Sequence, residues 1–237
     1  MNVDLIKISQ RNAAKIAGIT YPLSIILVIA VNLAIVAPII IKGNLPETAR
    51  NIMSNELSFR IGITGNILYS VLMVVLLVVL YSILKYVNKN LALFAALCRF
   101  ISSLTWLLIA FNQYTVLRLL SDADLSHAFG QEELYGMMKL HLSGQDAYYI
   151  GLLFWALAST TGSYLWFKSG YIPKILSITG VVSSAWCVLC TLIFYISPKF
   201  ADVVNLWWFD SPMVLFELTL SFWLLFKGLK LSGEINA

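Results

Sequence analysis

The chain has 237 residues, of which 59% are hydrophobic and only 12% are charged, and its net charge is +4. A soluble domain is about 25% charged, so the composition excludes an ordinary soluble protein and indicates a surface that mostly faces lipid. No Lys/Arg-rich stretch indicates nucleic-acid binding. We expect residues 1–237 to form a single transmembrane domain with no separate soluble domain.

Six segments are long and apolar enough, or nearly so, to form membrane helices, which need about 20 apolar residues each. In chain order they are about 16–41, 61–84, 91–117, 147–167, 174–196 and 212–227. The first is too long for the core of a cleaved signal peptide and is expected to be an uncleaved span. The predicted fold class is therefore all-α: a polytopic membrane protein with six transmembrane helices in one bundle.

The longest connection, residues 118–145, should carry a short amphipathic helix. Glu132 and Glu133 suit the first turn of a helix, because acids favour a helix N-terminus. Met137 and His141 then fall on one face at helical spacing, as in a helix that lies in the interface or caps the bundle. The Asp, Glu and His residues of this connection match no established ligand spacing, so no metal site is predicted.

The basic residues predict the orientation of the chain. They gather in the N-terminal segment, in the second and fourth connections and in the C-terminal tail, whereas most acids lie in the other connections. Because basic loops stay on the cytoplasmic side, both termini are predicted to be cytoplasmic. The residues of the basic side are Lys7, Arg11, Lys15, Lys85, Lys89, Lys168, Lys174, Lys227 and Lys230.

Two opposite charges, Arg99 and Glu217, interrupt membrane-spanning runs. A charge near the bilayer centre costs roughly 2.5–3.5 kcal/mol on insertion scales, so such residues are usually paired or functional. At 1.5 Å per residue, Arg99 lies roughly 13 Å and Glu217 roughly 15 Å from the inner helix ends. The matching depth permits a salt bridge, either as a structural pair or as part of a ligand or proton site.

Ser103, Trp106 and Gln113 extend this candidate site along the third helix, on one stripe with Arg99 by helical spacing, and Asn66 lies in the outer half of the second helix. Polar side chains at such depths face the bundle interior or a water-filled cavity. They could line a pocket open to the outside, or serve as hydrogen bonds between helices. The predicted ligand-binding residues are Arg99, Ser103, Trp106, Gln113, Glu217 and Asn66.

Four stretches of the chain carry a resemblance to a known family. They are residues 12–21, 56–63, 80–99 and 162–173, the last of which reads GSYLWFKSGYIP. The chain resembles an uncharacterised bacterial integral-membrane family, filed as domain of unknown function four-three-eight-six. The resemblance implies a six-helix protein of the bacterial cytoplasmic membrane and brings no assigned activity. It includes Arg99, but the sixth helix, which carries Glu217, matches only weakly.

The leading functional hypothesis is non-enzymatic binding of a small or lipid-like ligand in an outward-facing pocket between helices three and six. The first alternative is an intramembrane enzyme that acts on a lipophilic substrate, with Glu217 as general acid and Arg99 as electrostatic stabiliser. The second is a structural subunit of a membrane complex. No cofactor is predicted, and the expected partners are the lipid bilayer, a lipophilic ligand and either a second copy of the chain or a partner subunit.

Overall fold

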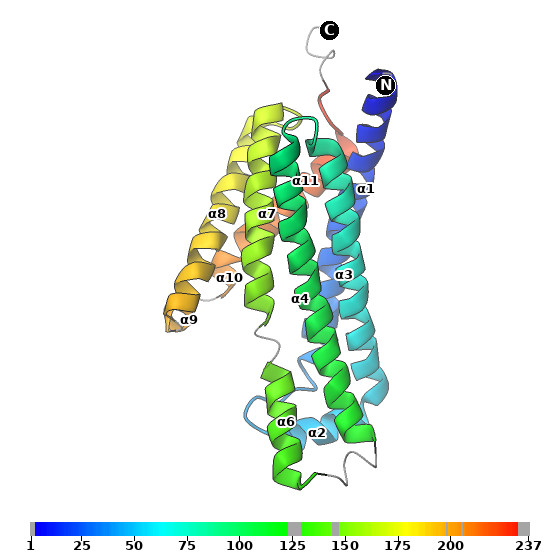
Figure 1. The fold of residues 1–237 in the computed structure, drawn as a ribbon, viewed down its shortest axis with the longest axis vertical. Helices are drawn as coiled ribbons and strands as arrows, with labels where there is room; N and C mark the ends of the chain where they lie inside the picture. The colour runs from blue at the N-terminus through cyan, green and yellow to red at the C-terminus, as the bar shows by residue number, and fades with distance from the viewer. Residues whose placement is uncertain (1–2, 123–128, 144–146, 198, 205, 232–237) are drawn as a thin grey trace. The chain divides into compact units, whose positions relative to one another are not determined.

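The computed structural model describes residues 3–122, 129–143, 147–197, 199–204 and 206–231, and these residues form helices joined by short connections (Figure 1). The long helices are α1 (Val3–Ile29), α3 (Glu56–Leu84), α4 (Lys89–Ser121), α7 (Ala147–Ser169), α8 (Lys174–Ile196) and α11 (Ser211–Phe226). The shorter elements are the π-helix η1 (Ala30–Val36) and the helices α2 (Leu45–Ser54), α6 (Gln131–Ser143), α9 (Phe200–Val203) and α10 (Leu206–Phe209).

The described residues contain five segments long and apolar enough to cross a membrane. They are Ile6–Val36, Glu56–Leu84, Lys89–Ser121, Lys174–Ile196 and a segment within residues 131–169 that contains α7. The apolar helix α11 is shorter, at 16 residues, or about 24 Å at 1.5 Å per residue. The predicted class, an all-α polytopic membrane protein, is confirmed by these long apolar helices.

Two elements differ from the predicted segments. The first helix begins at Val3 rather than near residue 16, because polar and basic residues form helix as readily as apolar ones where the chain leaves the membrane. The amphipathic helix α2 was missed altogether, because it contains no long apolar run. Its start was visible in the sequence: Asn44 accepts a hydrogen bond from the Glu47 backbone N–H at 3.1 Å, and Pro46 occupies the first turn.

The chain divides into two compact units. Unit 1 comprises residues 1–24, 72–102 and 149–237. It therefore contains the first part of α1, the second half of α3, the first part of α4, and α7, α8 and α11. Within this unit α8 packs along α11, and the start of α1 and the end of α11 lie at the same end (Figure 1).

Unit 2 comprises residues 25–71 and 103–148. Its core brings α2 and α6 against residues of α3 and α4, with Ile52, Phe59, Leu117 and Met138 fully buried. The close approach of η1 to α3 requires glycine, since a side chain at Gly62 would come within 2.7 Å of Val36 Cγ2. Unit 2 is thus held by ordinary hydrophobic packing.

Candidate functional site

Arg99 and Glu217 form a salt bridge in the interior of unit 1. Arg99 Nη2 lies 3.1 Å from Glu217 Oε1, and the two residues are only 3% and 1% exposed. The bridge joins α4 to α11. Two charges buried to this degree are tolerated only when they are paired and hydrogen-bonded, so their further contacts decide whether the pair is stable.

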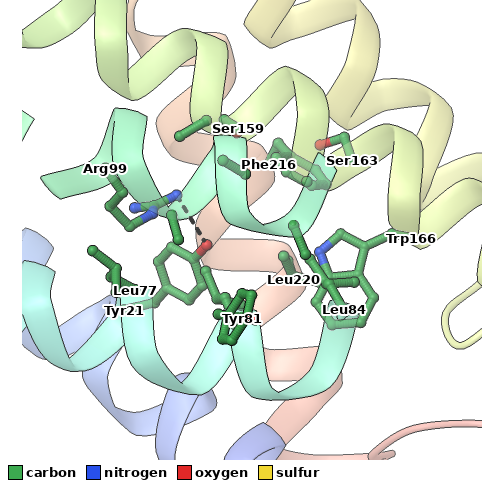
Figure 2. A pocket seen from close by; sticks show the side chains of 16 residues that line it. Tyr21, Leu77, Tyr81, Leu84, Arg99, Ser159, Ser163, Trp166, Phe216 and Leu220 are labelled. Atoms are coloured by element: carbon green, nitrogen blue, oxygen red, sulfur yellow. Dashed lines mark hydrogen bonds between the residues drawn. The ribbon is translucent and has the colours of Figure 1, made fainter. Parts of the chain in front are cut away.

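Two aromatic residues from other helices form further hydrogen bonds with the pair. Trp155 on α7 donates its indole N–H to both carboxylate oxygens of Glu217, at 3.0 Å and 3.2 Å. Arg99 Nη2 also donates to the Tyr21 hydroxyl on α1 at 3.4 Å, shown as the dashed line in Figure 2. The guanidinium carbon lies 5.6 Å from the centre of the Tyr21 ring, within the range of a cation–π interaction.

The same guanidinium contacts α3, because Arg99 Nη1 approaches Met73 Sδ at 3.8 Å. The charged pair therefore joins side chains from α1, α3, α4, α7 and α11 in one cluster. We call Tyr21, Met73, Arg99, Trp155 and Glu217 the arginine cluster. Each of its members is buried, so the polar contacts form in a low-dielectric setting where hydrogen bonds are strong and unpaired groups are costly.

A small cavity lies against the arginine cluster, on the side of Arg99 that faces the start of α4. Its volume is about 30 Å³, roughly enough for two water molecules. Arg99 and Tyr21 line it, whereas Glu217 does not (Figure 2). The remaining lining residues are Leu77, Leu80, Tyr81, Leu84, Ala92, Ala95, Ala96, Ala158, Ser159, Gly162, Ser163, Trp166, Phe216 and Leu220.

The cavity exists because small residues face large ones. The α4 face consists of alanines at 92, 95 and 96, and α7 contributes Ala158 and Gly162. An added Cβ at Gly162 would touch only Leu84 Cδ1, at 4.0 Å. Leu80, Tyr81 and Ala95 line the cavity while they remain half-buried, so these side chains of α3 and α4 separate the cavity from the surface of unit 1.

Two buried serines on α7 give the cavity its polar surface. The Ser163 hydroxyl is 1% exposed as a residue and has no hydrogen-bond partner among the described residues. The Ser159 hydroxyl lies beside the Glu217 carboxylate, but it does not meet the geometry of a hydrogen bond there. Because a buried hydroxyl without a partner costs free energy, these serines can each take a hydrogen bond from a molecule in the cavity.

The other predicted site residues lie in unit 2 and make contacts of their own. Asn32 donates its side-chain N–H to Asn66 Oδ1 at 3.1 Å, and Asn66 donates to Gln113 Oε1 at 3.0 Å. These three residues form an amide ladder between η1, α3 and α4. The outer atoms of the ladder, Asn32 Oδ1 and Gln113 Nε2, have no partner in the described part of the chain.

Ser103 and Trp106 also pack within unit 2. The backbone carbonyl of Ser103 accepts a hydrogen bond from Ser70 Oγ at 2.8 Å. The Trp106 ring contacts the rings of Tyr69 and Tyr148, with centroids 4.7 Å and 5.9 Å away. The structure thus brings Arg99 and Glu217 together, whereas Asn66, Ser103, Trp106 and Gln113 contribute to the packing of unit 2 and do not line the cavity.

Metal binding finds no support in the described residues, because no three His, Cys, Asp or Glu side chains among them gather closely enough to hold an ion. His141 instead contacts Asn112 Oδ1 through Nδ1 at 2.8 Å. Residues 123–128 and 144–146 of the outer connection lie outside the described residues. The chemistry available in the cavity is therefore hydrogen bonding and positive charge.

Tyr21, Trp155 and the cavity serines were missed from the sequence. A signal for the α7 residues was present: Trp155, Ser159, Gly162, Ser163 and Trp166 recur at helical spacing and define one inward face. Tyr21 gave a weaker signal, since a single tyrosine in an apolar run is typical of a membrane interface. A buried tryptophan also requires an acceptor for its N–H, and Glu217 supplies one.

The comparison with known families decides the membership of the chain. The model of the family described as Domain of unknown function (DUF4386) matches residues 16–228. The chain belongs to this family. The DUF4386 match extends over α11 and so includes Glu217, which the sequence alone had left with weak support. No curated protein and no solved structure matches the chain, so the functional argument depends on the geometry of the arginine cluster.

Proposed function

We propose that this DUF4386 protein is a non-enzymatic membrane protein that binds a small or lipid-like ligand in the cavity beside Arg99. The observation that supports the proposal is an arginine, Arg99, that is 3% exposed as a residue and yet lines a cavity. A charged group at membrane depth is expensive to maintain, and residues of this kind commonly mark ligand or ion pathways.

The chemistry of the wall favours an amphipathic ligand. Arg99 and the two serines can bind a small polar head, and the leucines and aromatic residues suit an apolar tail. The volume of about 30 Å³ admits a polar head of a few atoms, with the tail extending past Tyr81 between α3 and α4. A binding role is favoured over catalysis, because the proposed general acid Glu217 does not line the cavity and is held by Arg99 and Trp155.

Filling the cavity tests this proposal. Gly162→Leu places a side chain where an added Cβ has room, so the variant should fold while the cavity closes. We expect native mass spectrometry of wild type in mild detergent to show a retained small molecule, and we expect Gly162→Leu to lose it.

Gly136→Leu is the matched control, because Gly136 is also helical, is exposed and has no atom within 4 Å of an added Cβ. The control should retain the molecule at the level of wild type. Two results would contradict the proposal. One is a wild-type protein that carries no bound molecule, and the other is equal occupancy in Gly162→Leu and Gly136→Leu.

A purely structural role is the second candidate, and one observation favours it. The salt bridge already receives hydrogen bonds from Trp155 and contacts from Tyr21 and Met73, so it joins five helices without any ligand. The structural candidate predicts that Gly162→Leu leaves all properties of the protein unchanged. The ligand-binding candidate predicts loss of the retained molecule, so the same experiment separates the two.

We also propose that α11 crosses the membrane as a sixth helix, with both termini cytoplasmic in the bacterial inner membrane. Five crossings would place the termini on opposite sides, whereas the start of α1 and the end of α11 lie at one end of unit 1. Fusions of a periplasm-active phosphatase to either terminus should be inactive. Phosphatase activity at one terminus alone would show that the chain crosses the membrane an odd number of times.

A further inference from the structure

A second cavity lies in unit 1 at the end where α1 begins and α11 ends, and it shares no residue with the Arg99 cavity. Its volume is about 400 Å³, which is large enough for a phospholipid head group. We call it the basic groove. Its lining residues are Ile8, Arg11, Asn12, Lys15, Leu224, Leu225, Phe226, Lys227, Gly228 and Leu229.

The shape of the groove follows from how α1 and α11 meet. They approach closely at Gly18, where an added Cβ would lie 2.9 Å from the backbone N of Leu225. Nearer the helix ends the chain of α11 turns away, because Gly228 adopts φ 70° and its N–H bonds back to the Trp223 carbonyl at 3.0 Å. The helices therefore leave a gap between them at this end.

The groove combines positive charge with apolar surface. Arg11, Lys15 and Lys227 carry the charge and are exposed, and none of the residues that line the groove is acidic. Ile8 and Phe226 lie at the rim with 55% and 74% of their surface exposed. Lysine and arginine at the end of a membrane helix bind phosphate, while exposed apolar side chains there are expected to lie against acyl chains.

The basic groove lies at the end of unit 1 that the charge bias predicts to be cytoplasmic. Gln10 donates to the Ile83 carbonyl at 3.1 Å, next to the connection that carries Lys85. The backbone N–H of Lys230 donates to the Tyr171 carbonyl at 2.9 Å, in the connection between Lys168 and Lys174. All these basic segments therefore meet at one level, where a cytoplasmic leaflet presents anionic lipid.

We infer that the basic groove binds the head group of an anionic phospholipid, with its phosphate between Lys15 and Lys227 and its acyl chains along Ile8 and Phe226. A free phosphate would use the charges alone and would leave the apolar rim exposed. The lipid uses both parts of the groove. This site does not depend on the ligand proposed for the Arg99 cavity.

The test uses the full-length protein in mild detergent, titrated with phosphatidylglycerol or phosphatidylcholine and examined by native mass spectrometry. The groove variant is Lys15→Gln/Lys227→Gln. The control is Lys168→Gln/Lys174→Gln, which removes the same charge from exposed positions at the same end of unit 1. We expect wild type to prefer phosphatidylglycerol, the groove variant to bind it roughly tenfold more weakly, and the control to stay close to wild type.

Several outcomes would overturn the inference. Equal weakening in the groove variant and the control would mean diffuse attraction to surface charge rather than a site. Unchanged phosphatidylglycerol binding by the groove variant would show that the lipid does not bind in the basic groove. Displacement of phosphatidylglycerol by millimolar inorganic phosphate would assign the groove to a soluble anion. Lys15→Arg/Lys227→Arg should keep the preference, and Gly162→Leu should not alter it, which separates this site from the Arg99 cavity.

Discussion

Helix α4 carries two buried polar networks, one in each unit, and they satisfy their polar groups differently. In unit 1, Arg99 and Glu217 form a charged pair in which Glu217 also accepts a hydrogen bond from Trp155 and Arg99 also donates one to Tyr21. In unit 2, the neutral amide ladder ends in two atoms without partners among the described residues. Charges need full pairing, while neutral amides tolerate partial pairing at modest cost.

The comparison of the two networks predicts the largest loss of stability for substitutions of the charged pair. Arg99→Met and Glu217→Met should each destabilise the protein, by about 3–5 kcal/mol for an uncompensated buried charge. The double variant Arg99→Met/Glu217→Met should recover most of the loss, because two apolar side chains of similar size can replace a buried ion pair. Thermal unfolding in detergent measures all three. A double variant as unstable as the sum of the single variants would show that the two residues act independently.

A smaller loss is expected at the indole of Trp155. Trp155→Phe keeps an aromatic ring and removes the N–H that bonds both Glu217 oxygens. Hydrogen bonds to charged groups contribute about 1.5–3 kcal/mol, so the unfolding temperature should drop clearly but less than with Glu217→Met. In an Arg99→Met/Glu217→Met background the same change should have little effect. A full-sized loss in that background would mean that the ring, and not the hydrogen bond, matters.

The amide ladder should contribute less to stability than the hydrogen bonds of Trp155. Asn66→Leu removes the central member, so Asn32 and Gln113 each lose their hydrogen bond to Asn66. Hydrogen bonds between membrane helices average about 0.6 kcal/mol and reach about 1.7 kcal/mol. We expect a loss within that range in chemical unfolding. A loss as large as that of Arg99→Met would remove the distinction between the charged and the neutral network.

The smallest effect is expected for a charged pair at the surface. Arg60 and Glu56 form an ion pair at 2.7 Å with side chains 49% and 38% exposed. Arg60→Gln should change stability by about 0.5 kcal/mol or less, since solvent screens such pairs. The pair therefore serves as a control for burial: the charges match those of Arg99 and Glu217, but the environment differs. A loss above about 1 kcal/mol would show that burial alone does not explain the unit 1 network.

The sequence was enough to predict the fold class, because apolar runs of membrane length have few alternatives to helices. It was also enough to select Arg99 and Glu217, because charges inside such runs are rare and costly. Helix α2 was not predicted, because an amphipathic helix of 10 residues contains no apolar run of membrane length. The predicted polar stripe on α4 faces inward, but the structure divides it between the two units at Ser102 and Ser103.

The partners of the charged pair could not be predicted from the sequence, for a physical reason. Helical spacing fixes which residues of one helix share a face, but it does not fix which helices touch. Tyr21 and Trp155 belong to the arginine cluster only because α1 and α7 pack beside α4 and α11. The same holds for the cavity, which forms where the alanines of α4 meet Gly162 of α7.

The most direct test of the central claim is photo-crosslinking from inside the cavity. A photoreactive phenylalanine derivative at Tyr81 lies in the cavity wall, and the same group at Phe94, which is 46% exposed on α4, samples the surrounding lipid. After irradiation in native membranes, we predict that the Tyr81 position acquires one discrete mass that disappears with Arg99→Met, while Phe94 acquires the mixture of membrane lipids. A Tyr81 spectrum that shows no adduct, or the same mixture as Phe94 with or without Arg99, would contradict a ligand site beside Arg99.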